Sequence, residues 1–472
     1  MFFRYTYIFT LFLTTLLHVT TASTTTDNIR IEPSTSRFID QYGRERIFHG
    51  INAVYKRAPY LPVAPADWVI NQKVLTKFKS LGINVLRLGL MYVGAMPRKG
   101  WLNSTYFDSV ETLVKLCQDN GIYTLLDAHQ DLFSERFGGD GFPSWSLIQG
   151  NAKSFPYPYN ETNLSWELYY MTEIVNSGFG YFYNNTDNLQ YYYTQFWSES
   201  AKRFAKYSHM LGYELMNEPW PGDVFQDILI ALPYKAYKQN LQPLYDTLSK
   251  EIWIQDPDHL VFFETITWDL ECSGIEHVPG YAVNANKTVL SYHYYVPPQF
   301  FLNDTIFHKF RVRDKFSCGS MLTEFEAWNG ETDDFKEVLK TADEWKESWI
   351  GWLSNPLALF SNSASFLSTF AHPYPQIVAG RISVMNFEPE SNIFTLSYIT
   401  NTKITSNETV IFVNKEMHYP NDFSINSTPT VGITIKRNDD NYHIIVYHNN
   451  NISNNGITVK ITISPKTELN NL

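Results

Sequence analysis

Residues 212–220 read GYELMNEPW, an apolar segment that runs directly into Asn217 and Glu218. The alternating Tyr213 and Leu215 are typical of a buried β-strand. A carboxylate at the end of such a strand is costly unless it has a partner, because desolvation disfavours its charged form. Either a neighbour satisfies Glu218, or the protein makes use of its protonated form.

Apolar segments of similar length alternate with helical patterns between about residues 38 and 355. Residues 107–117, for example, repeat apolar side chains at helical spacing, and Gly121 follows as a stop signal. Strands that alternate with helices in this way predict a (β/α)8 barrel, which we place at residues 28–370. A doubly wound open sheet is the alternative, but no G-x-G-x-x-G sequence follows an early strand. The expected strands lie in IFHGINAV, NVLRLGL, YTLLDAH, GYELMNE, LVFFETI, VLSYHYY, MLTEF and SWIGWLS.

The pattern changes after about residue 375. Segments such as RISVMNF, IFTLSYIT and GITVKITIS alternate with a period of two, and RNDDNY supplies turn residues between them. We find no helical pattern there and expect a β-sandwich over residues 371–472.

The composition is that of a globular protein, with 44% hydrophobic and 18% charged residues in a chain of 472 residues. This length predicts two domains rather than one small core. A net charge of −11 argues against nucleic acid as a partner, because phosphates require a basic surface. We expect a monomer.

The first residues read as a secretory signal peptide, which we place at residues 1–22. Arg4 precedes an apolar run at residues 8–17, and small residues at 20–23 offer a cleavage point. The chain is therefore expected to be secreted or to reach a lysosomal or digestive compartment. Sequons for N-glycosylation agree with that route and lie at Asn103, Asn160, Asn163, Asn184, Asn286, Asn303, Asn407, Asn426 and Asn451.

The chain has three cysteines. Cys117 lies on the apolar side of an expected helix and is interpreted as a core thiol. Cys272 and Cys318 lie in loop-like contexts and could form a disulfide in an oxidising compartment, although the sequence alone leaves the pairing open.

Polar side chains stand at the carboxyl ends of the expected barrel strands, where barrel enzymes keep their catalytic groups. Two carboxylates in such a place suit glycoside hydrolysis, in which one carboxyl protonates the leaving oxygen and the other attacks or activates water. The candidates are Arg87, His129, Asp131, Asn217, Glu218, Glu264, His293, Tyr295, Glu324 and Trp352.

Each candidate also has a purely structural interpretation. Glu218 could pair with a core arginine, His293 could be a satisfied core histidine, and Trp352 could be packing. A metal site at His129 and Asp131 lacks a third ligand at a convincing spacing, so we predict no metal and no cofactor. Glu264 and Glu326 compete with Glu324 for the second carboxylate role.

Several motifs together resemble glycoside hydrolase family 5 of clan A, and within it the endoglycoceramidases. These motifs are LRLGL, LLDAHQDLFSE, GFPSW, GYELMNEPW, SYHYY, LTEFE and HPYPQIVAG. The resemblance covers most of the barrel and the entry to the sandwich. It implies hydrolysis, with retention, of the bond between the oligosaccharide and the ceramide of a glycosphingolipid, which a membrane surface could present.

The resemblance also implies roles for individual residues. Glu218 would be the acid/base and Glu324 the nucleophile. The residues that would bind the substrate or hold the nucleophile in place are Lys56, Arg87, His129, Asp131, Asn217, His293, Tyr295 and Trp352.

The lipid side is less sharply defined by the sequence. Apolar residues after strands three and four could line a channel for the acyl chains, because apolar walls gain by burying methylenes. We name Phe133, Trp145 and Trp220 for this role.

Three other functions remain open. A family 5 β-glucosidase acting on glucosylceramide or steryl glucoside would differ only in how the sugar side of the cleft is closed. A cellulase-type cleft has no need of the apolar residues, and a silent glycolipid-binding protein has no need of both carboxylates.

Overall fold

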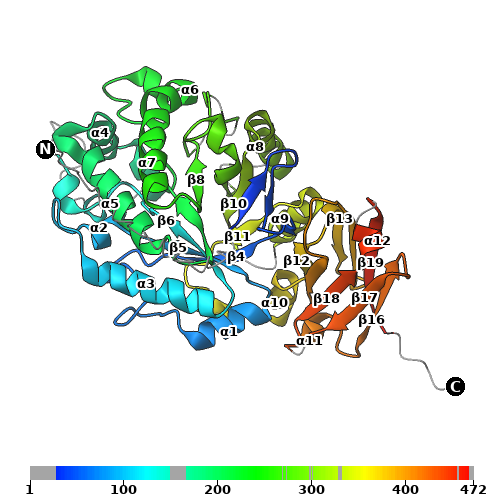
Figure 1. Cartoon of the computed structure of the whole chain (residues 1–472). Coiled ribbons are helices and arrows are strands. Elements are labelled where there is room, and N and C mark those ends of the chain that lie inside the picture. Colours follow the sequence, from blue (N-terminus) through cyan, green and yellow to red (C-terminus); the bar gives the residue numbers. More distant parts are fainter. Residues whose placement is uncertain are drawn as a thin grey trace, which may run out of the picture.

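The computed structural model describes residues 28–148, 166–267, 269, 271–272, 274–296, 299, 301–327, 332–438, 440–453 and 456–466. It consists of a closed barrel followed by a β-sandwich (Figure 1). The expected signal peptide and the sequons at Asn160 and Asn163 lie outside these residues. Within the described part, no helix has both the length and the apolar character needed to cross a membrane.

The barrel closes with parallel neighbours in the order β10-β11-β4-β5-β6-β7-β8-β9, which confirms the predicted (β/α)8 architecture. Each of these strands is buried along its length, because helices cover the outside and side chains fill the inside. The strands are β4 (His49–Ala53), β5 (Val85–Gly89), β6 (Tyr123–Asp127), β7 (Met210–Glu214), β8 (Leu260–Glu264), β9 (Thr288–Tyr294), β10 (Gly319–Phe325) and β11 (Trp349–Gly351).

Helices of the barrel start and stop where local chemistry dictates. Asn103 caps α3 by accepting a hydrogen bond from the Tyr106 amide, and Gly121 takes a positive φ of 70° just beyond the helix. The helices are α1 (Gln72–Ser80), α2 (Tyr92–Ala95), α3 (Ser104–Asp119), α4 (Glu173–Tyr183), α5 (Leu189–Phe204), α6 (Pro233–Ala236), α7 (Gln242–Gln255), α8 (Leu302–Phe316), α9 (Asp333–Trp345) and α10 (Ala364–Phe370).

Two antiparallel sheets make up the sandwich. Alternate residues of β14, among them Phe394, Leu396 and Tyr398, are buried in the core between them. One sheet contains β13 (Arg381–Glu388), β14 (Ile393–Ile399), β19 (Thr458–Pro465) and β16 (Phe423–Thr428). The other contains β1 (Arg30–Glu32), β2 (Arg37–Ile39), β3 (Glu45–Arg46), β12 (Tyr374–Val378), β15 (Glu408–Phe412), β18 (His443–His448) and β17 (Ile433–Arg437).

Two features of this region differ from the sequence analysis. The three N-terminal strands extend a sheet of the sandwich, which their two or three residues could not signal by periodicity. Two short helices that we did not expect, α11 (Lys415–His418) and α12 (Asn450–Ser453), connect sandwich strands.

The hairpin of β1 and β2 also covers the amino end of the barrel. Ile31 and Phe38 belong to one apolar cluster with Phe48 of the barrel wall. A side chain at Gly319 would place its Cβ 2.5 Å from Ile31, so the hairpin lies against the start of β10. The N-terminal segment therefore joins the barrel to the sandwich.

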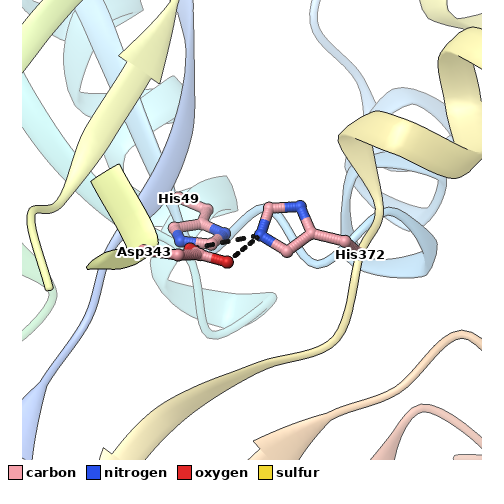
Figure 2. Close-up of side chains that lie close together, drawn as sticks. All are labelled: His49, Asp343 and His372. Atoms are coloured by element: carbon pink, nitrogen blue, oxygen red, sulfur yellow. Dashed lines mark hydrogen bonds and ion pairs between the residues drawn. The ribbon is translucent and has the colours of Figure 1, made fainter. Parts of the chain in front are cut away.

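A buried ion pair lies at the junction of the two domains (Figure 2). His372, in the loop before β12, lies 3.1 Å from the carboxylate of Asp343 on α9. The other ring nitrogen of His372 contacts the Thr369 carbonyl at 3.1 Å. Because a carbonyl and a carboxylate can only accept, both ring nitrogens carry protons. His49, at the start of β4, lies beside the pair with its ring stacked on Tyr374.

The structure corrects the proposed disulfide. Cys272 and Cys318 are free thiols, each buried in the apolar core, as is Cys117. Burial raises the pKa of Cys272 against the effect of nearby Lys309, with which its thiol interacts. Burial likewise raises the pKa of Cys318 to about 12. Both thiols are accommodated as small core groups rather than as a bridge.

The sequon asparagines within the described residues differ in their exposure to solvent. Asn103 is half-buried, and its side-chain amide donates to the Gly94 carbonyl at 3.2 Å while its oxygen caps α3. This position is therefore a poor acceptor of a glycan. The exposed sequon asparagines are Asn184, Asn286, Asn303, Asn407, Asn426 and Asn451, and their glycosylation stays a prediction.

Candidate active site

A cavity of about 790 Å³ opens at the carboxyl ends of the barrel strands. Carboxylates, basic and polar groups, and apolar side chains share its lining. Candidates that line it are Lys56, His129, Asp131, Asn217, Glu218, Trp220, Glu264, His293, Tyr295, Glu324, Glu326 and Trp352. Arg87 lies beneath it, fully buried.

Arg87 is the central cation of the site. Its guanidinium pairs with Glu324 at 2.5 Å and with Asp127 at 3.1 Å, and it also bonds Glu214. Burial lowers the pKa of Arg87, but Asp127, Glu214 and Glu324 together raise it well above its ordinary value. The guanidinium therefore remains charged in the core, where an unpaired charge would be prohibitively costly.

Glu324 ends β10 and is held on both carboxylate oxygens. One oxygen accepts from Arg87, and the other accepts from the Tyr295 hydroxyl at 2.8 Å. Burial alone would raise the pKa of Glu324, but His293 and Arg87 outweigh it and lower the pKa. Burial, together with the Glu324 charge, raises the pKa of Tyr295 well above 10, so its hydroxyl stays a donor. Glu324 is thus an ionised, oriented carboxylate, as a nucleophile requires.

Glu218 follows β7 in an unusual backbone conformation, with a positive φ of 42°. The side-chain amide of Gln130 donates to the carbonyls of Asn217 and Glu218 at 2.9 and 3.0 Å. In return, the Gln130 oxygen accepts from the Phe133 amide at 2.9 Å. These bonds hold the strained turn that points Glu218 into the cavity.

The two carboxylates of the expected pair face the same imidazole. A ring nitrogen of His293 lies 2.8 Å from Glu218 and 3.6 Å from Glu324. The carboxylate oxygens of Glu218 and Glu324 that face this ring lie within 4.8 Å of each other. Such proximity suits a retaining pair, whose carboxyl groups are about 5–5.5 Å apart, rather than an inverting pair, whose carboxyl groups are about 6.5–9.5 Å apart.

Glu264 lies behind this pair, with an oxygen 3.4 Å from the second ring nitrogen of His293. Burial lowers the pKa of His293, but Glu264, Glu324 and the bond to Glu218 raise it to about 10. Burial raises the pKa of Glu264 well above its ordinary value, and the neighbouring Glu214 raises it further. Glu324 is bonded to Arg87 and Tyr295, whereas Glu264 lies 3.8 Å from Arg87 and 3.4 Å from His293.

The opposite wall of the cavity carries the sugar-side candidates. Lys56 bonds Asp131 and lies 4.9 Å above the Trp352 ring, and His129 stacks on that ring at 5.5 Å. Burial lowers the pKa of His129, but Asp127 opposes it and raises the pKa to about 10. An aromatic face beside charged hydrogen-bonding groups is suited to a sugar ring.

The predicted lipid-facing residues are only partly in place. Phe133 is fully buried against Phe142 and Phe179, and it does not line the cavity. Trp145 packs on Tyr92 and donates to a backbone carbonyl, also away from the cavity. These two positions are corrected to core and packing roles, because the loop after β6 folds back on α4. Only Trp220 lines the cavity.

Sequence reasoning missed several residues that hold the site. Asp140 is buried 3.9 Å from Lys56, and burial together with Asp131 raises its pKa to about 7 against the effect of Lys56. Asn52 on β4 accepts from Arg87 at 2.9 Å. Gln130 was visible inside DAHQD, but its contacts depend on the folded turn.

Carboxylates and histidines of the site also form groups that could in principle ligate a metal. They are His129 with Asp131 and Asp140, Glu214 with Glu264 and His293, and Glu218 with His293 and Glu324. In each group a basic side chain, Lys56 or Arg87, already lies beside a carboxylate.

Comparison with known proteins agrees with this geometry. The family model for cellulase (glycosyl hydrolase family 5) matches residues 40–357. The chain belongs to glycosyl hydrolase family 5. The model for the glycoside hydrolase family 5 C-terminal domain matches residues 372–463, which cover most of the sandwich of this family 5 enzyme.

Two curated relatives resemble this glycoside hydrolase over nearly its whole length. An endoglycoceramidase of Cyanea nozakii is 35% identical, covering 93% of this chain and 94% of its own. An endoglycoceramidase of Hydra vulgaris is 35% identical, covering 92% and 90%. Among solved structures, endo-glycoceramidase II from Rhodococcus sp. in complex with ganglioside GM3 has a TM-score of 0.74. It covers 90% of this chain and 98% of its own at 21% identity, which supports the family 5 fold.

Proposed function

We propose that this protein is an endoglycoceramidase, which hydrolyses the β-glycosidic bond between the oligosaccharide and the ceramide of glycosphingolipids. The observation that carries the proposal is the Glu218–Glu324 pair at the floor of one cavity. Similarity to two endoglycoceramidases over more than nine-tenths of this chain supports the substrate class.

In the first step Glu324 attacks the anomeric carbon and forms a covalent glycosyl-enzyme. Glu218 donates its proton to the departing ceramide oxygen, so that the leaving group departs as a neutral alcohol. Arg87 and Tyr295 hold the Glu324 carboxylate in place before attack.

In the second step Glu218, now ionised, removes a proton from a water molecule that attacks the same anomeric carbon. Glu324 leaves, and the configuration of the sugar is retained after two inversions. The side-chain amide of Asn217 donates one hydrogen to the Gln130 carbonyl at 3.0 Å and keeps a second for a substrate hydroxyl. The two steps use only side chains of this chain and water.

The sugar next to the scissile bond would lie over Trp352, within reach of Lys56, His129 and Asp131. Burial raises the pKa of Asp131, but Lys56 outweighs it and holds the pKa well below the ordinary range. Asp131 is therefore an ionised acceptor for sugar hydroxyls.

The ceramide would leave the cavity across an apolar rim. Leu168 and Val296 line the cavity and are exposed. Trp220 also lines it but is buried. Further along the same end of the barrel, the connection after β7 exposes Ile228 by 73% and Leu229 by 54%. An apolar rim of this kind supports presentation of the substrate at a membrane surface.

The remaining features of the proposal rest on the sequence. The N-terminal signal pattern and the sequons support secretion, or delivery to a lysosomal or digestive compartment, of a glycosylated protein. We propose that the enzyme acts as a monomer, since one chain supplies the whole catalytic constellation.

The test is product analysis by mass spectrometry after incubation with a ganglioside and, separately, with glucosylceramide. Intact oligosaccharide plus ceramide, absent with Glu324→Gln, is the expected result. Glucose from glucosylceramide without any product from the ganglioside would instead indicate a β-glucosidase. Binding without any product would indicate a silent glycolipid-binding protein.

A further inference from the structure

A second pocket, of about 300 Å³, lies at the opposite end of the barrel from the catalytic cavity. The turn between β1 and β2 forms one side, the C-terminal part of α8 another, and the start of β13 a third. Helices of a barrel run antiparallel to its strands, so the end of α8 lies at the amino ends of the strands. The pocket is thus shared by the barrel and the sandwich.

Arginines dominate the chemistry of this pocket. Arg37, Arg313 and Arg381 all line it, in a protein whose net charge is −11. Burial lowers the pKa of Arg37, and both Arg313 and Arg381 lower it further against Glu45 and Glu347. Arg37 is therefore repelled by both of the other guanidiniums, while its own Nη1 donates to the Lys346 carbonyl.

Two donors of the pocket are buried without a partner. Nη1 of Arg313 has no hydrogen bond among the described residues, although the residue is only 8% exposed. The hydroxyl of Thr35 is likewise buried without a partner in the described part of the chain. An unsatisfied buried donor destabilises the folded state, and a charged one does so more strongly. Arg313 and Thr35 both line the pocket, and neither of these two atoms has an acceptor among the described residues.

The acidic neighbours are already engaged. Asp314 pairs with the Nη2 side of Arg313 at 2.8 Å, leaving Nη1 free of it. Glu45 accepts from the Ile382 amide at 2.9 Å. Burial raises the pKa of Glu45 against the effect of Arg37, so that Glu45 compensates the arginines only in part. No ion pair or hydrogen bond of the Arg381 side chain occurs among the described residues.

We propose that this pocket binds a small oxyanion of the phosphate class, held by Arg37, Arg313 and Arg381 with the Thr35 hydroxyl. Guanidinium groups recognise phosphate oxygens by paired, charge-assisted hydrogen bonds. The anion relieves the repulsion among the arginines and satisfies both orphaned donors. Because it connects hairpin, helix and sandwich, its effect is to stabilise the junction of the two domains.

The ligand is a free anion rather than the headgroup of a membrane lipid. The pocket lies at the far end of the barrel from the apolar rim that would face a membrane. Its lining is mainly polar and charged, with Pro33 and Ile382 as the apolar members, in contrast to the catalytic cavity.

Thermal unfolding of the full chain in sodium phosphate, against sodium chloride of equal ionic strength, tests the proposal. We expect a rise in Tm of about 1–2 °C that saturates with phosphate concentration. Titration calorimetry with inorganic phosphate should show one site. The double variant Arg37→Gln/Arg381→Gln, which spares the buried Arg313, should lose both effects and keep wild-type hydrolysis.

The control is Arg437→Gln, an exposed arginine of the sandwich that pairs with Asp422. It should keep the phosphate effect. Phosphate also stabilises proteins by exclusion from their surface, but that effect does not saturate and would persist in the double variant. A Tm rise equal in wild type and double variant, or no calorimetric site, overturns the proposal. Capture by phosphatidic acid vesicles through Arg381, without binding of inorganic phosphate, also overturns it in favour of a lipid source.

Discussion

At the scale of single residues, Glu218 and Glu324 differ in the groups that contact their carboxylates. Glu324 is bonded to Arg87 and Tyr295, both of which favour its ionised form. Glu218 faces His293 and the open cavity instead. These contacts agree with the proposed roles of Glu324 as nucleophile and Glu218 as acid/base.

Glu218→Gln should lower kcat on ganglioside by about 10²–10⁴-fold, because general acid catalysis typically contributes that much. An activated aryl glycoside needs no protonated leaving oxygen, so its cleavage to the glycosyl-enzyme should be nearly unaffected. Pre-steady-state release of the aryl alcohol measures this step. Equal losses on both substrates would exclude Glu218 as the acid.

Gln130→Ala should weaken proton transfer by Glu218 indirectly. It removes the bonds to the Asn217 and Glu218 carbonyls that hold the positive φ of Glu218. We expect kcat on ganglioside to fall by about 10–100-fold, as for a loosely held catalytic group. The loss on an activated aryl glycoside should be smaller.

A matched control for this variant is Gln72→Ala on the surface helix α1, which should change neither rate. If Gln130 had only a structural role, its removal would lower kcat equally on both substrates, which would contradict the prediction. Kinetics on the two substrates, with circular dichroism as a check on folding, decide between them.

At the scale of elements, the loop before β12 is fastened to α9 by the His372–Asp343 pair (Figure 2). Burial lowers the pKa of His372, but Asp343 outweighs it and raises the pKa above 6.5. A raised folded-state pKa means that the pair contributes its full stability below about pH 6.5, the unfolded value. The contribution is lost as the pH rises through the folded-state pKa.

Asp343→Asn should therefore reduce the free energy of unfolding most at acidic pH, by about 3 kcal/mol for a broken buried pair. The difference from wild type should shrink at alkaline pH. His129 and His293 also have raised pKa values of about 10, but they titrate alike in both proteins and cancel in the difference. Urea unfolding at several pH values measures the difference in the free energy of unfolding between wild type and variant. A difference that grows with pH would contradict the prediction.

Local sequence patterns predicted some elements of the fold and missed others. Each barrel strand is a buried apolar run of three to seven residues, and the helices between them carry the helical period. Those local patterns were enough for the fold class. The short strands β1 and β3 carry no such pattern. β1 pairs locally with β2, but β3 pairs with β12 from a distant part of the chain.

At the scale of the whole molecule, the two ends of the barrel have different chemistry. The mouth combines the acidic site with exposed apolar side chains, and the opposite end carries the arginine pocket and the N-terminal hairpin. Figure 1 shows that the sandwich lies beside the barrel rather than over its centre. The N-terminal hairpin extends one sheet of the sandwich and packs against the barrel.

The double variant Ile228→Ser/Leu229→Ser should lower activity on ganglioside embedded in vesicles by about 5–20-fold. Each exposed side chain that enters a lipid surface contributes roughly 1 kcal/mol through buried methylenes. Activity on a soluble aryl glycoside should stay unchanged, since neither residue lines the cavity.

Ile254→Ser is the matched control for that variant. Ile254 is 62% exposed near the C-terminal end of α7, which lies at the opposite end of the barrel. It should leave both activities unchanged. If it lowers vesicle activity as strongly as the rim variant, the mouth has no special role in contacting lipid.

The sequence by itself determined the fold class and the strand-end residues that gather at the barrel mouth. Both follow from local periodicity and from the closed barrel, which brings the carboxyl ends of all its strands together. Tertiary structure alone decided that Phe133 is core, that Cys272 and Cys318 stay apart as thiols, and that Gln130 supports Glu218. It also created the arginine pocket from three segments far apart in the chain. Contacts made by loops and between elements far apart in the chain leave no period in a sequence, because they form only when separate elements pack together.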